Sequence, residues 1–166
     1  MTDLIRAEGL EKSYFTPAGE LKVLKGIDCR IGKGEMVGIV GVSGAGKSTF
    51  LHLLGTLDRP TAGTITYQPG ATEVNPFSLN DRDLASFRNR VTGFIFQFHY
   101  LLPEFTALEN VMMPGLISRG LKSEVGSQKE LRERAETLLD ELGLSARKDH
   151  RPGELSGGEQ QRVAVA

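Results

Sequence analysis

The chain has 166 residues, a formal net charge of −1, 25% charged residues and 39% hydrophobic residues. The length predicts one domain with a sizeable core, and the balanced charge argues against a nucleic-acid-binding protein. The single cysteine, Cys29, excludes an internal disulfide framework and is expected to be a small buried hydrophobe. The chain has neither a signal-peptide core nor an apolar run long enough to cross a bilayer. We therefore expect a soluble protein that meets a membrane only through a partner.

The first elements are expected to be two β-strands, over residues 4–10 and 21–31. A polar loop through residues 17–20 joins them and predicts a hairpin. Residues 32–34 read Gly-Lys-Gly and predict a turn into the next strand. These segments indicate a small antiparallel sheet beside the main core.

A glycine-rich loop between an apolar run and a helix is the strongest motif. Residues 36–40 predict a buried strand, and Gly41, Gly46, Lys47 and Ser48 fit G-x-x-x-x-G-K-[ST]. Glycines let backbone N–H groups approach an anion, and the following helix directs its unpaired N–H groups at the same place. Lysine reaches the β- and γ-phosphates, and the serine hydroxyl ligates Mg²⁺. The expected phosphate-binding residues are Gly41, Val42, Ser43, Gly44, Ala45, Gly46, Lys47, Ser48 and Thr49.

Alternating strands and helices are expected after the loop. The helix from Lys47 should end near Gly55, residues 60–63 predict a turn, and residues 64–67 predict a strand. Ser78 or Asn80 is expected to cap a helix that runs to about Arg90. Residues 91–96 are apolar and predict a second buried strand that ends at Gln97.

The remaining chain is expected to be helical. Thr106 with Glu109, and Ser127 with Glu130, have the spacing of capping boxes at two helix starts. Pro114 should kink or end the first of these helices. The second presents one apolar face and should stop at Gly143. The apolar positions of that face are Leu131, Ala135, Leu138, Leu139 and Leu142.

A second glycine-flanked helix start lies near residue 156. Ser156 can cap a helix, and Gly157 and Gly158 would leave its N-terminal amides accessible to an anion. Taken alone, the pattern is more typical of an ordinary capped helix than of an anion site.

The motifs together resemble those of ABC-transporter ATPases, over essentially the whole of Met1–Ala166. The loop at Gly41 is similar to their phosphate loop, and Leu155-Ser156-Gly157-Gly158-Glu159-Gln160 is similar to their signature motif. Gln97 matches the glutamine of their Q-loop. Tyr14 matches the aromatic residue that stacks on adenine.

A closer resemblance is visible after Gln97. The run Phe98-His99-Tyr100-Leu101-Leu102-Pro103 is similar to the ATP-binding subunits of bacterial lipoprotein-releasing (Lol) systems. Macrolide-type exporters and cell-division ABC complexes share much of the overall pattern but fit this run less well. They stay open as alternatives, as do a non-catalytic nucleotide-binding fragment and, ranked last, a small-molecule kinase.

The resemblance implies an α/β fold, a P-loop NTPase of ABC type with a RecA-like parallel sheet that is incomplete at its C-terminus. Residues 1–35 and 61–75 would form an antiparallel β part, and residues 36–60 and 76–97 the nucleotide core. Residues 98–166 would form a helical subdomain with the signature helix.

The resemblance also implies ATP and Mg²⁺ as ligands, with Ser48 and Gln97 placing the metal. Two copies would meet head to tail, so that Ser156, Gly157, Gly158 and Glu159 contact the ATP of the partner copy. Integral membrane subunits would dock between Phe98 and Leu116, at the cytoplasmic face of the bacterial inner membrane. The implied function is ATP binding and hydrolysis that powers lipoprotein release.

Catalytic groups of the family are missing from the 166 residues. The family pattern continues past the signature helix into a strand ending in aspartate, a catalytic glutamate and a switch histidine. None of His52, His99 and His150 stands at the switch position, and no carboxylate is placed by motif as the general base. We therefore expect this chain alone to hydrolyse ATP poorly or not at all, with an exposed sheet edge.

Overall fold

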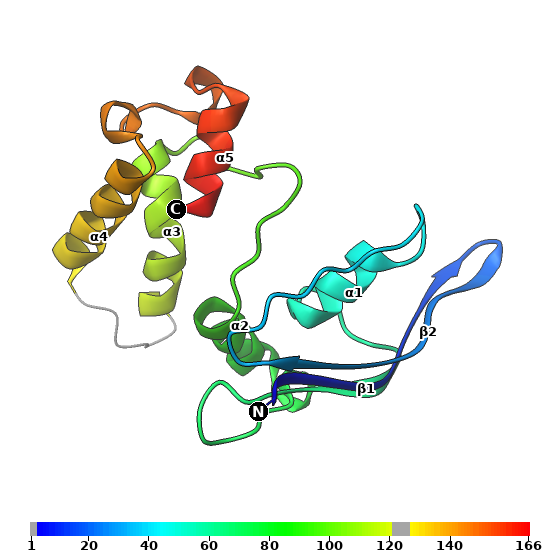
Figure 1. Cartoon of the computed structure of the whole chain (residues 1–166). Helices are drawn as coiled ribbons and strands as arrows, with labels where there is room; N and C mark the ends of the chain where they lie inside the picture. The colour runs from blue at the N-terminus through cyan, green and yellow to red at the C-terminus, as the bar shows by residue number, and fades with distance from the viewer. Residues whose placement is uncertain (1–2, 121–126) are drawn as a thin grey trace. The chain divides into compact units, whose positions relative to one another are not determined.

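The computed structural model describes residues 3–120 and 127–166 (Figure 1). The chain divides into two compact units, Met1–Thr92 and Gly93–Ala166. Each unit has its own hydrophobic cluster, and each is described by itself below.

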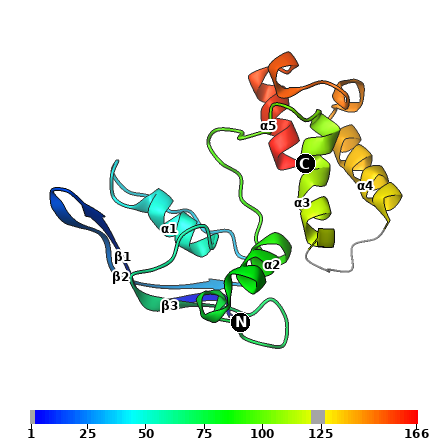
Figure 2. The ribbon, with the colours of Figure 1, turned by 180° about the vertical axis from the view of Figure 1, so that it is seen from behind.

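The first unit is built on a three-stranded antiparallel sheet. The strands β1 (Asp3–Thr16), β2 (Gly19–Gly32) and β3 (Ala62–Tyr67) lie in the order β2-β1-β3, which Figure 2 shows from behind. Thr16 pairs with Gly19 across the hairpin turn. The expected hairpin and all three expected strands are confirmed, and β1 and β2 are longer than their apolar patterns predict.

The core of this unit lies between the sheet and two helices, α1 (Lys47–Leu54) and α2 (Asp81–Val91). The helix α1 runs along the sheet in both ribbon views (Figures 1 and 2). Tyr67 and Phe87 meet edge to face with ring centroids 5.1 Å apart, and the Tyr67 hydroxyl donates to the Leu54 carbonyl at the end of α1. The fully or nearly buried core residues are Ala7, Leu10, Leu24, Phe50, Leu53, Leu54, Ile65, Tyr67 and Phe87.

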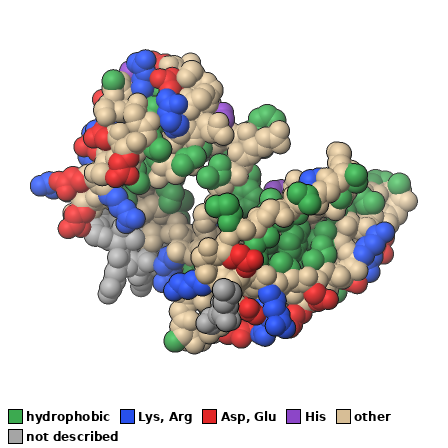
Figure 3. All heavy atoms as spheres, in the orientation of Figure 1, with side chains coloured by type: hydrophobic (Ala, Val, Ile, Leu, Met, Phe, Trp, Pro, Cys, Tyr) green, Lys and Arg blue, Asp and Glu red, His purple; other side chains and the backbone are tan. Residues whose placement is uncertain are grey.

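Residues 36–40 do not form the buried strand that was expected. They have no regular secondary structure, and the side chains of Met36 and Val40 are 97% and 92% exposed. A strand needs a neighbour to pair its N–H and C=O groups, and the described residues provide this segment with none. Only Ile39 packs against the core cluster. Hydrophobic side chains are accordingly visible at the surface of this unit (Figure 3).

The expected strand over residues 91–96 is also wrong. Val91 is the last residue of α2, and residues 92–96 are irregular, with Ile95 58% exposed. The aromatic side chains of this segment contact each other instead, with the Phe94 and Phe96 rings 4.5 Å apart. Among the described residues the only sheet is the antiparallel one, so the expected parallel sheet is not formed in them.

Helix starts follow the expected capping residues. Asn80, and not Ser78, caps α2 by accepting from the Asp83 N–H. Ser78 lies instead in η1 (Pro76–Ser78), where its hydroxyl donates to the Asn75 carbonyl. The glycine at position 55 is the C-cap of α1, as expected.

The second unit is helical. It contains α3 (Ala107–Gly120), α4 (Gln128–Glu141) and α5 (Gly157–Val165), with two short 3₁₀ turns, η2 (Ser145–Arg147) and η3 (Pro152–Glu154). Both expected capping boxes are present, at Thr106 and at Ser127. The core residues are Ala107, Leu108, Met112, Ala135, Leu139, Leu144, Leu155 and Val163.

Pro114 does not end its helix, because α3 continues to Gly120. The missing N–H of proline costs one helix hydrogen bond, and packing of α3 against α4 offsets that loss. Gly115 makes the close approach possible, since a Cβ there would lie 2.3 Å from Leu131 Cδ1. Within the described residues, no helix is long and apolar enough to cross a membrane.

The pairing of β1 with β3 depends on Gly63. Its φ is +82°, and a Cβ at this position would lie 2.3 Å from the carbonyl oxygen of Gly9. We expect Gly63→Ala to lower the free energy of unfolding by about 2–4 kcal/mol, because it combines backbone strain with a backbone clash. Chemical denaturation monitored by circular dichroism measures this change. Gly70→Ala is the control, because a Cβ there meets nothing within 4 Å; equal stability of the two variants would contradict the assigned role of Gly63.

Candidate nucleotide-binding site

The glycine-rich loop leads into a helix whose first backbone N–H groups have no side-chain cap. Gly44 and Gly46 have φ of +77° and +86°, values that glycine adopts without strain. Gly46 is the N-cap of α1, and no side chain caps this helix. The first backbone bond of the helix runs from Phe50 N–H to the Gly46 carbonyl at 2.8 Å. The N–H groups of residues 46–49 therefore precede the helical ladder and suit an anion.

Gly46 also fixes the loop to the sheet. A Cβ at this position would lie 2.8 Å from Leu24 Cδ2 and 3.1 Å from Val23 Cγ1 of β2. The backbone of the loop thus approaches the strand more closely than any other residue would allow. This contact holds the first turn of α1, and its amides, in a defined place.

Lys47 folds back over the loop. Its Nζ donates to the carbonyl oxygens of Gly41 at 2.8 Å and Val42 at 2.7 Å. The ammonium group is therefore placed at the glycine loop beside the bare amides. The loop residues Gly41 to Ala45 are exposed, so a ligand can reach this positive group from solvent.

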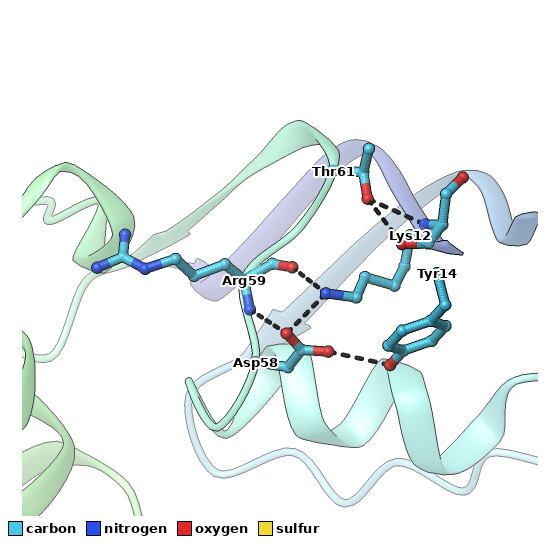
Figure 4. Close-up of polar contacts among 6 residues, drawn as sticks. Lys12, Tyr14, Asp58, Arg59 and Thr61 are labelled. Atoms are coloured by element: carbon cyan, nitrogen blue, oxygen red, sulfur yellow. Dashed lines mark hydrogen bonds and ion pairs between the residues drawn. The ribbon is translucent and has the colours of Figure 1, made fainter. Parts of the chain in front are cut away.

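Tyr14 lies on β1 and is 38% exposed. Its hydroxyl donates to Asp58 Oδ2 at 2.9 Å, and the Nζ of Lys12 lies 4.9 Å from the ring centroid (Figure 4). Partial burial, followed by the hydrogen bond and charge of Asp58, raises the pKa of Tyr14, whereas a hydrogen bond with Thr49 acts in the opposite direction. Gly46 approaches Leu24 of β2, which pairs with Lys12 of β1, so Tyr14 lies on the sheet near the first turn of α1.

The sequence patterns did not identify Lys12 and Asp58. The alternation of a strand does bring Lys12 to the same face as Tyr14, two residues away, which is a signal that could have been used. Nothing local indicates Asp58, which lies 46 residues from Lys12.

Ser156 and Glu159 form a capping box at the second glycine-flanked helix start. Glu159 Oε2 accepts from the Ser156 N–H and hydroxyl, both at 2.8 Å, and Glu159 Oε1 accepts from Arg147 Nε at 3.0 Å. Hydrogen bonds from Ser156 and then Arg147 lower the pKa of Glu159 from about 4.5 to about 2. The exposed Gly157 and Gly158 present the first backbone of α5 to solvent.

The expected site residues fall in both units. Tyr14 and the glycine loop belong to Met1–Thr92, whereas Gln97 and Ser156 to Glu159 belong to Gly93–Ala166. Gln97 is exposed and lies in a bend after the irregular residues 92–96. The first unit brings Tyr14 and the loop together, and the roles of Gln97 and of residues 156–159 stay predictions.

A glycine loop with a bare helix end and a lysine folded over it defines a phosphate-binding protein of the P-loop class. The sequence pattern of the family described as ABC transporter matches residues 24–166. The chain belongs to this ABC transporter family.

Similar relatives support the same assignment. The chain is 52% identical over 166 residues to the lipoprotein-releasing system ATP-binding protein LolD of Geobacter metallireducens, covering 100% of this chain and 69% of that protein. It is 53% identical over 163 residues to the protein of the same name from Bacteroides thetaiotaomicron, covering 98% of this chain and 68% of the relative.

Two solved structures share the fold. One is a dimeric post-hydrolysis state of the ATP-binding cassette MJ0796 bound to ADP and Pi, with a TM-score of 0.84 and 37% identity. The other is a dimeric structure of MJ0796, a bacterial ABC transporter cassette, with a TM-score of 0.85 and 36% identity. Each covers 97% of this chain and 67% of the other. The expected ABC-type fold class is therefore confirmed, although two of its expected strands are not formed here.

The depressed pKa of Glu159 predicts a loss of stability in acid. The folded state holds the carboxylate ionised, so this contribution is complete above about pH 5 and is lost as the pH falls toward 2. We expect Glu159→Gln to lower stability at pH 7 and to reduce the acid-dependent loss, measured by denaturation at several pH values.

Glu133→Gln is the matched control, since the Glu133 side chain is exposed in α4 and pairs with Lys129 at 3.8 Å in an i,i+4 contact. Unchanged acid dependence in Glu159→Gln would contradict the assigned role.

Proposed function

We propose that this chain is the ATP-binding subunit of a bacterial lipoprotein-releasing system, and that it binds ATP to power release of lipoproteins from the cytoplasmic membrane. The main support for this proposal is about 50% sequence identity, along the whole chain, to relatives named LolD. The resemblance at residues 98–103 points to the same subfamily. Macrolide-type export and cell-division complexes are the alternatives within the family.

Binding of the triphosphate would use groups that the first unit already orients. The amides of residues 46–49 would donate to phosphate oxygens, and Lys47 would exchange its bonds to Gly41 and Val42 for the β- and γ-phosphates. Ser48 lies in the first turn of α1, where its hydroxyl fits an Mg²⁺ ligand. Mg²⁺, when bound, would offset the negative charge of the phosphates.

A complete site would need a second copy. The neighbouring structures of MJ0796 are described as dimeric, which supports a head-to-tail dimer here as well. In that dimer Ser156, Gly157 and Gly158 would face the γ-phosphate of the partner's ATP. Glu159 would act by holding Ser156 in place, as its present hydrogen bonds suggest.

Docking on integral membrane subunits would place the protein at the cytoplasmic face of the inner membrane as a peripheral subunit. The segment between Phe98 and Leu116 is the proposed contact. Phe98, Tyr100 and Leu102 in this segment are exposed large hydrophobic residues, which suits a protein partner.

Hydrolysis would require a general base, and no carboxylate of the described residues is placed by motif for that role. We therefore propose that the 166 residues by themselves bind ATP without efficient turnover. A non-catalytic nucleotide-binding fragment is the corresponding alternative function.

Lys47→Ala is expected to weaken ATP binding about 10- to 100-fold, because one charge-assisted set of hydrogen bonds is worth about 1.5–3 kcal/mol. Isothermal titration calorimetry measures the affinity, and released phosphate is measured in the same samples. Lys33→Ala, in the exposed turn after β2, is the control. Equal ATP affinity in Lys47→Ala and the unmodified chain would contradict a phosphate site at the loop.

Partner choice tests the subfamily. We expect the chain to co-purify with the membrane subunits of a lipoprotein-releasing system in preference to those of a macrolide-type exporter. Replacing residues 98–116 with the corresponding exporter segment should reverse this preference and leave ATP affinity unchanged. Retention of the original partner by the exchanged chain would place the contact elsewhere.

A further inference from the structure

Two charged side chains contact Tyr14. Stacking of a base on the ring would not by itself require either of them. Its hydroxyl is bonded to Asp58, and the ammonium group of Lys12 lies 4.9 Å from the ring centroid (Figure 4). A cation at this distance is attracted to the face of the ring. One face of Tyr14 is therefore occupied by Lys12, which leaves only the opposite face for a ligand.

Asp58 joins the two side chains. Its Oδ1 accepts from Lys12 Nζ at 2.6 Å and from the Arg59 N–H at 2.7 Å, while its Oδ2 accepts from Tyr14. Burial acts to raise the pKa of Asp58, but the hydrogen bonds from Lys12, Tyr14 and Arg59 together hold the pKa below its usual range. The carboxylate is thus ionised at neutral pH, and both of its oxygens accept hydrogen bonds. Lys12 Nζ also donates to the Arg59 carbonyl at 2.7 Å.

The position of Asp58 is set by both helices of the unit. The Leu57 N–H donates to the His52 carbonyl of α1 at 2.8 Å. Thr56 has a φ of +56° and is 1% exposed. Its carbonyl accepts from Arg88 Nε at 3.0 Å and Arg88 Nη2 at 2.6 Å, from α2. The turn that carries Asp58 is therefore held between α1 and α2 rather than free.

We propose that Lys12 and Asp58 are positioning residues that fix the Tyr14 ring so that its uncovered face receives a nucleobase, an inference that rests on the proposed nucleotide-binding function. Gly46, at the start of α1, approaches Leu24 of β2, which pairs with Lys12 of β1. The Tyr14 ring, two residues further along β1, therefore lies near the loop, where a base attached to loop-bound phosphates would reach. Lys12 blocks one face and Asp58 fixes the rotation of the ring. An aromatic ring stacks with any base. The contacts of Lys12 and Asp58 with Tyr14 therefore set the affinity for the nucleoside and do not select among bases.

The test separates the base from the phosphates. Affinities for ATP, GTP and inorganic tripolyphosphate are measured by calorimetry on the full chain and on Tyr14→Phe, Asp58→Asn and Tyr14→Ala. Tyr14→Ala is expected to weaken ATP binding about tenfold. Tyr14→Phe and Asp58→Asn keep the ring but free it, so a loss of about threefold is expected for ATP and GTP alike. Tripolyphosphate affinity should not change in any of them.

Arg59→Ala is the matched control, because it shortens the neighbouring side chain, which bonds to Phe77 O and Asp81, and leaves the backbone contacts to Lys12 and Asp58. Normal ATP affinity in both Tyr14→Phe and Asp58→Asn, with a loss in Tyr14→Ala, would overturn the positioning role and leave the stacking role intact. A parallel loss of tripolyphosphate affinity would reveal a general structural role and also overturn it. A full chain that binds none of the three ligands would contradict the proposed function itself.

Discussion

The packing of α1 on the antiparallel sheet is the contact on which the first unit depends. Phe50 and Leu53 are buried in one cluster with Leu10 and Ile65 of the sheet, and each such side chain contributes about 1.5–3 kcal/mol on burial. The glycine loop ends in the first turn of α1, so this apolar contact also sets the direction of the loop amides. Gly46 completes the arrangement, because only a residue without Cβ lets the loop approach β2 so closely. A hydrophobic interface thereby orients an electrostatic site.

The opposite end of α1 supports the same region in a different way. The turn after the helix is held by Arg88 of α2 through Thr56, and it presents Asp58 to Tyr14. One helix therefore organises both parts of the proposed ligand site. The free amides lie at its N-terminus, and Asp58, which binds the Tyr14 hydroxyl, follows its C-terminus. The second unit uses a different device, in which Ser156 and Glu159 satisfy the helix end and glycines leave the adjacent backbone open.

Two apolar segments show the limit of pattern reading. Residues 36–40 and 91–96 were predicted as buried strands from their composition, yet Val91 ends α2, and residues 36–40 and 92–96 are irregular and partly exposed. The apolar composition of these segments indicates only that their side chains suit a buried strand. It does not provide the neighbouring strand, and backbone groups of an extended segment need a partner to form a ladder. By contrast, the hairpin of β1 and β2 was predicted because both partners are close in sequence.

The sequence by itself determined the features whose causes lie within a few residues. These are the caps at Thr106, Ser127 and Ser156, the glycine loop into α1, and motifs specific enough to indicate the ABC family. Each cap depends on a side chain and a backbone N–H three positions apart, which local geometry alone brings together. Only the tertiary structure decided that Asp58 meets Lys12 and Tyr14. Asp58 lies 44 positions from Tyr14 and 46 from Lys12 along the chain. The three residues meet because burial of the α1 face against the sheet brings the turn after α1 to β1.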